Sequence, residues 1–87
     1  MGNAYDELGE TRRAVKVYEQ ALKIHREIGN RPSEAIALFN IGVALDKLGE
    51  RAKAIAHVKA AIKIFGQIES PYAERARAQL AEWRGEA

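Results

Sequence analysis

The chain contains no cysteine, so it can form no disulfide, no thiolate nucleophile and no cysteine-based zinc site. No apolar run approaches the roughly 20 residues that a membrane-spanning helix needs. The first residues also lack the basic-then-apolar pattern of a signal peptide. We therefore expect a cytoplasmic protein without a membrane partner. The net charge of +2 is too small to indicate a polyanionic partner by itself.

Residue patterns that carry catalysis or bind metals are also scarce. His25 and His57 have no second histidine or carboxylate at metal-binding spacing. No glycine-rich phosphate loop and no nucleophile elbow occurs. Ser33 and Ser70 stand where helix caps are expected. The sequence thus predicts no catalytic residue, no metal site and no cofactor, in a protein that is not an enzyme.

What the chain does contain is an internal repeat with a period of 40 residues. Unrelated segments of this composition would share about two residues in thirty. A period of this length is typical of a solenoid, in which each unit buries its apolar face against its neighbours. Eleven positions of segment 1–30 recur in segment 41–70: Gly2/Gly42, Ala4/Ala44, Asp6/Asp46, Leu8/Leu48, Gly9/Gly49, Glu10/Glu50, Ala14/Ala54, Ala21/Ala61, Lys23/Lys63, Ile24/Ile64 and Ile28/Ile68.

Glycines divide the units into helices. Gly9 and Gly49 each stand between leucine and glutamate, where glycine suits the left-handed residue that ends a helix. Apolar residues at helical spacing follow each of them. Segment 29–33 combines glycine, asparagine and an early proline, which is typical of a helix end followed by a helix start. We expect an all-α chain of about five helices, at about 1–8, 11–28, 32–48, 51–68 and 71–84.

Small residues predict close contact between the helices of a pair. Gly42 falls inside a predicted helix, where glycine costs about 1 kcal/mol relative to alanine. It therefore needs a packing reason, and Ala54 and Ala61 on the following helix supply one. Gly2, Ala14 and Ala21 are the counterparts in the first unit.

This pattern resembles the tetratricopeptide repeat family. The period of 40 is similar to the longer-helix variety found in kinesin light chains and bacterial regulatory arrays. The resemblance implies a right-handed helical solenoid forming one domain over 1–87. Its parts would be an N-terminally truncated repeat (1–30), a full repeat (31–69) and a C-terminal capping helix (70–87). The residues that match the family signature are Gly2, Tyr5, Ala14, Tyr18 and Ala21 in the first unit, and Gly42, Leu45, Ala54, Val58 and Ala61 in the second.

The resemblance also implies a scaffold that binds a protein or peptide. In the family, the first helix of each pair lines a concave groove. Asn40 stands where an amide often bonds a peptide backbone, although it could equally be solvated. Ile36 and Phe39 could instead pack between helices. The candidates are Ile36, Phe39, Asn40, Val43, Asp46 and Lys47 in the second unit, Asn3, Asp6 and Glu7 in the first, and Arg75, Ala78 and Gln79 in the last helix.

Two further expectations concern surfaces. The first helix begins at Met1, well inside the position of a full repeat, which favours a fragment of a longer array or an engineered unit. We expect the open N-terminal edge to recruit a second copy as a homodimer or a domain-swapped oligomer. The alternative function is a basic convex surface that binds nucleic acid or an acidic protein, although glutamates interrupt it. Its cations are Arg12, Arg13, Lys16, Lys23, Arg26, Arg51, Lys53, Lys59 and Lys63.

Overall fold

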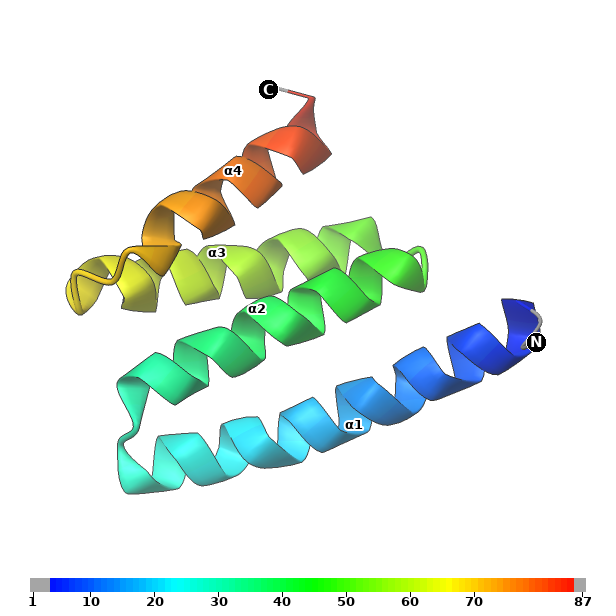
Figure 1. Cartoon of the computed structure of the whole chain (residues 1–87), viewed down its shortest axis with the longest axis horizontal. Helices are drawn as coiled ribbons and strands as arrows, with labels where there is room; N and C mark the ends of the chain where they lie inside the picture. The colour runs from blue at the N-terminus through cyan, green and yellow to red at the C-terminus, as the bar shows by residue number, and fades with distance from the viewer. Residues whose placement is uncertain (1–3, 86–87) are drawn as a thin grey trace.

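The computed structural model describes the backbone of residues 4–85 and the side chains of residues 8–85. Within this part of the chain all regular structure is helical. Successive helices run antiparallel and follow one another across the molecule, each packing on its neighbours in sequence (Figure 1). The expected all-α arrangement of tandem helix pairs is confirmed. The four helices are α1 (Ala4–Ile28), α2 (Arg31–Lys47), α3 (Arg51–Gln67) and α4 (Tyr72–Arg84).

The helix break that we expected at Gly9 does not occur, so the first two predicted helices form the single helix α1. Gly29 and Gly49 adopt left-handed φ angles of 72° and 80°, whereas Gly9 does not. The eight residues before Gly9 would make only about two turns, too short to gain much by folding back on their own. Continuing the helix keeps the backbone hydrogen bonds, and an interior glycine costs only about 1 kcal/mol.

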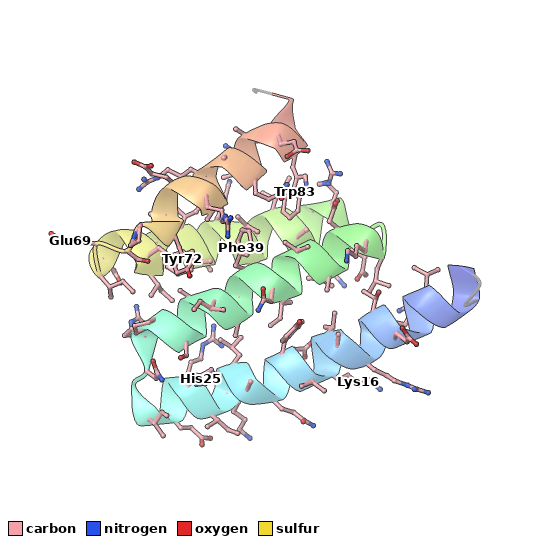
Figure 2. All side chains as sticks on the ribbon, viewed as in Figure 1. Lys16, His25, Phe39, Glu69, Tyr72 and Trp83 are labelled. Carbon is pink, nitrogen blue, oxygen red and sulfur yellow. The ribbon has the colours of Figure 1, made fainter. Side chains whose placement is uncertain are left out.

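The helices end in turns that recur every 20 residues. Gly29, Gly49 and Glu69 all have positive φ, and Glu69 reaches 54° without the freedom of glycine. The side chain of Glu69 points away from the helices (Figure 2). After the first turn Asn30, and not Ser33, is the capping side chain, since its Oδ1 accepts from the backbone N–H of Ser33 at 3.3 Å. These local contacts explain why α2 begins where it does.

α2 and α3 approach each other closely at Gly42. A Cβ added to Gly42 would lie 2.7 Å from Cγ2 of Val58 and 3.1 Å from the carbonyl oxygen of Ala54. Ala54, Val58 and Ala61 are fully buried. The close contact predicted for Gly42 is therefore confirmed.

Charged side chains join the helices at both ends of the molecule. At one end the buried carboxylate of Glu34 accepts from Arg26 at 3.2 Å and from Arg31 at 2.9 Å. Arg31 also donates to Oε1 of Gln67, which links α2 to the end of α3. At the other end Arg51, the first residue of α3, donates to Asp46 and covers the ring of Trp83.

Candidate functional site

A pocket of about 180 Å³ lies between α2 and α4. Phe39 and Asn40 line it from α2, and Tyr72 and Arg75 line it from α4. Phe65 of α3, only 2% exposed, closes the bottom, with its ring centroid 5.8 Å from that of Tyr72. Figure 2 shows Phe39 and Tyr72 on the same side of the molecule, between the two helices. The remaining lining residues are Ile36 and Ala76.

The two walls of the pocket are built by the same helical spacing. On α2 the lining residues are Ile36, Phe39 and Asn40, at positions i, i+3 and i+4. Residues at this spacing share one face of a helix. On α4 the same spacing recurs in the wall residues: Tyr72, Arg75 and Ala76. The pocket thus follows from two helix faces that meet above α3.

The polar groups of the pocket are available to a ligand. Among residues 8–85, neither the amide of Asn40 nor the guanidinium of Arg75 has a hydrogen bond or an ion pair. An amide both donates and accepts hydrogen bonds, whereas a guanidinium only donates. The pocket therefore offers apolar walls, one amide and one cation to a molecule that enters it.

The structure separates the candidates predicted on α2 into two groups. Ile36, Phe39 and Asn40 lie together in the pocket, while Val43 is half-buried and outside its lining. Asp46 accepts from Arg51, and Lys47 is exposed at the last residue of α2. The second group thus lies beyond the pocket, toward the end of the helix.

The candidates from the other helices divide in the same way. Of the three on α4, only Arg75 lines the pocket, and exposed Ala78 and half-buried Gln79 do not. Asn3 lies outside the described residues, and the side chains of Asp6 and Glu7 are not among those described. The sequence interpretation missed three lining residues. The signal that could have found two of them is the spacing on α4, which copies that on α2; the three are Phe65, Tyr72 and Ala76.

A family model described as tetratricopeptide repeat matches residues 1–67. The chain belongs to the tetratricopeptide repeat family. The match ends at the last residue of α3, so α4 and its wall of the pocket lie outside it. Neither a curated protein nor a solved structure matches the chain. Tetratricopeptide repeats generally mediate protein–protein interaction and scaffolding.

Two other features that this tetratricopeptide repeat chain could carry are a metal site and a membrane-spanning helix. Within the described residues, no three histidine, aspartate or glutamate side chains gather as a metal site would require. No helix in the same part of the chain is long and apolar enough to cross a membrane.

The outer face of α1 is a second surface of interest. Val17 is 61% exposed, Ile24 54% and Ile28 67%. In a tetratricopeptide repeat this helix would be the second of a pair, whose first helix covers such a face. Here the expected first helix is continuous with α1 and cannot fold over it. This apolar face is exposed in the part of the chain that the structure describes.

The surface between α1 and α3 carries five of the nine predicted basic residues, together with acidic ones. Its shallow hollows are lined by Arg12, Lys16 and Lys53 together with the carboxylates of Glu19 and Glu50. Lys53 pairs with Glu50 at 3.3 Å. The face is therefore one of mixed charge.

Proposed function

We propose that this tetratricopeptide repeat protein is a non-catalytic scaffold that binds a peptide or a helix of a partner protein in the pocket between α2 and α4. These are the first helices of their pairs, which in the family line the concave face. The observation that carries the proposal is the pocket itself, apolar on its walls and with its amide and guanidinium unpaired. Its volume is about 180 Å³, below the roughly 300–1,000 Å³ of small-molecule pockets. A single large apolar side chain suits it better than a cofactor.

The proposed ligand follows from the chemistry of the lining. An aliphatic or aromatic side chain would enter between Phe39 and Tyr72, above Phe65. Asn40 would bond the peptide backbone beside that side chain, since an amide matches both the N–H and the C=O of a peptide group. Arg75 favours a carboxylate near the same point. We therefore propose a ligand with an apolar anchor next to an acidic residue.

The proposed domain organisation supports this role. Residues 1–87 would form one domain, with a truncated repeat over 1–30, a full repeat over 31–69 and a cap over 70–87. The support for a cap is the outward surface of α4, where Glu74, Arg77 and Arg84 are exposed. A solenoid needs such a polar surface where its stacking ends.

The test is a selection of 12-residue peptides from a random library, followed by titration of the selected peptide into isotope-labelled protein. We expect amide shifts to concentrate in α2, α3 and α4 around the pocket. Ile36→Asp and Asn40→Ala should each weaken binding at least tenfold, because they remove apolar contact and backbone hydrogen bonds. The matched control is Ile24→Asp, an exposed apolar position on α1, which should bind the peptide as well as the parent chain does. Shifts centred on α1 would contradict the proposal.

A second proposed function is self-association through the open edge of α1. The observation that favours it is the exposure of Val17, Ile24 and Ile28 on one helix. Apolar side chains gathered on one exposed face are typical of protein interfaces. A measurement of molecular mass against concentration tests this, and the two functions are compatible because the edge and the pocket lie on different helices.

The alternative of a basic surface for nucleic acid or an acidic protein has weaker support. Glu19 lies in both hollows between α1 and α3, and Glu50 in one of them, so carboxylates would oppose a phosphate backbone. Arg26 is already paired with Glu34. Binding to a DNA duplex that falls steeply with salt concentration would favour this alternative.

A further inference from the structure

We propose that the open edge of α1 pairs with α1 of a second copy in antiparallel orientation, about a two-fold axis near Ala21. The inference rests on the proposed self-association and specifies its geometry. The consequence is a closed dimer in which the two copies face each other through α1. The pockets between α2 and α4 would remain free on both copies.

The first observation is the spacing of the apolar face. Its residues recur at alternating intervals of three and four, the interval that keeps a stripe facing one partner helix. The stripe covers about 21 Å along α1, from the rise per residue. It comprises Ala14, Val17, Ala21, Ile24 and Ile28. A second stripe, with buried Val15 and Leu22, is used by α2.

The size of the side chains favours a crossing near the centre of the stripe. Ala21 is small, so two helices can approach closely there, as α2 and α3 do at Gly42. An antiparallel crossing at Ala21 brings Val17 of one copy near Ile24 of the other. It also brings Ala14 near Ile28, again a smaller residue against a larger one. The three strongly exposed apolar side chains would then all be covered.

Charge decides the direction of the pairing. Arg13 and Glu27 flank the stripe on the side away from α2, near opposite ends, and both are exposed. Within residues 8–85 neither belongs to an ion pair. Antiparallel pairing about the two-fold axis sets Arg13 of each copy beside Glu27 of the other, on the same side of the interface. Parallel pairing would separate these opposite charges by about 21 Å along the axis. Opposed helix dipoles favour the antiparallel arrangement as well.

The edge of α4 is a poorer partner for the stripe. Aligning α4 with α2 at an offset of 39 places Glu74 and Arg77 where α2 has Ala35 and Leu38. Ala35 is fully buried and Leu38 is 3% exposed. Head-to-tail stacking would therefore bury charges that lack partners, which costs far more than the apolar contact returns. Pairing of two like edges closes a dimer, whereas head-to-tail contacts generate open filaments.

The absence of native cysteine allows a direct test by cross-linking, because each single-cysteine variant has only one thiol. A disulfide needs Cα atoms about 4.4–6.8 Å apart. We expect Ala21→Cys to form a disulfide dimer under mild oxidation. Ile28→Cys is the control, because antiparallel pairing separates its two copies by about 21 Å along the axis. Efficient cross-linking of Ile28→Cys would mean that the copies pair in parallel and would overturn the proposed geometry while leaving self-association intact.

Sedimentation equilibrium over a range of concentrations supplies the second test. Ile24→Glu should weaken dimerisation at least tenfold, and Ile36→Glu, an exposed apolar position in the pocket, should leave it unchanged. Arg13→Glu should weaken the dimer, and the double variant Arg13→Glu/Glu27→Arg should restore it. Circular dichroism checks that each variant stays folded.

The remaining outcomes separate the proposals. A parent chain that stays monomeric at every concentration overturns both self-association and this geometry. Growth into assemblies larger than a dimer overturns the closed two-fold pairing. If the Ile36→Glu variant no longer binds the peptide but still dimerises, the pocket and the edge act independently. Loss of peptide binding in Ile24→Glu would instead tell against the pocket proposal alone.

Discussion

α1 and α3 contain equivalent segments of successive repeats, yet their apolar faces are buried to very different extents. Ile64 of α3 is 5% exposed, while its counterpart 40 residues earlier, Ile24 of α1, is 54% exposed. Ala54 is fully buried and its counterpart Ala14 only partly. The cause is the number of neighbours, because α3 packs against α2 and α4, and α1 packs against α2 (Figure 1). The repeated sequence encodes a helix suited to two neighbours.

The same comparison explains the two glycines that precede these segments. Gly49 ends α2 in a left-handed conformation, and α3 then returns along α2. Gly9 stands in the same sequence context but remains helical. A helix reversal is stable when enough apolar surface meets on both sides of the turn. A glycine at this position therefore permits the turn, and the packing of the flanking helices determines whether the turn forms.

The largest expected difference in stability between variants of α1 and α3 concerns the equivalent isoleucines Ile24 and Ile64. Ile64→Ala should lower the free energy of unfolding by about 3 kcal/mol, because it removes buried methyl groups and leaves a cavity. Ile24→Ala should change it by no more than about 0.5 kcal/mol in the monomer, as surface substitutions do. Urea unfolding at a concentration where the chain is monomeric measures both. Equal losses would mean that the outer face of α1 is covered in the folded monomer.

The second prediction exchanges the two glycines for alanine. Gly49→Ala should destabilise the protein by about 1–2 kcal/mol, since alanine adopts a left-handed conformation poorly. Gly9→Ala should stabilise it by about 0.5–1 kcal/mol, since alanine is the better residue inside a helix and no atom lies within 4 Å of the added Cβ. Thermal unfolding of the two variants measures the difference. Destabilisation by Gly9→Ala would show that the chain does turn at this glycine.

The smallest expected effect concerns Glu69, which holds the position of Gly29 and Gly49 in the third turn. Glu69→Gly should stabilise the protein by about 0.5–1 kcal/mol, because relief of the left-handed strain exceeds the entropy that glycine loses on folding. Glu69→Ala is the control, and it should bring no such gain because alanine keeps a Cβ. Chemical denaturation resolves the two variants. Equal stability of the glycine variant and the parent would show that the turn is unstrained.

Much of the fold could be predicted from local signals. The ends of α2, α3 and α4 lie within one residue of their predicted positions, since glycine, asparagine and proline act on the backbone beside them. The contact of Gly42 followed from the repeat, because a glycine inside a helix requires a close neighbour. The continuity of α1 could not be predicted in this way. It depends on how much surface lies before Gly9, and no local pattern measures that.

The pocket could be predicted only on its α2 side. Ile36, Phe39 and Asn40 share a helix face by their spacing, and the family resemblance selected that face. Phe65 of α3 lines the pocket only because α4 leaves its side chain accessible from the space between α2 and α4. α4 matches the repeat poorly and lies outside the family match, and the offset of 39 aligns Tyr72 with Ser33, which does not line the pocket. The binding role of all these residues stays a prediction.

The contacts of Arg51 bear on when the pocket exists. Its guanidinium lies 5.5 Å from the centroid of the Trp83 ring and donates to the Trp83 carbonyl at 3.2 Å, near the end of α4. Arg51 belongs to α3, and α4 packs mainly on that helix, so α4 can detach by local unfolding while α1, α2 and α3 stay packed. One wall of the pocket, with Tyr72 and Arg75, would leave with it. A ligand in the pocket would then slow amide hydrogen exchange throughout α4, and recognition would be coupled to the local folding of the last helix.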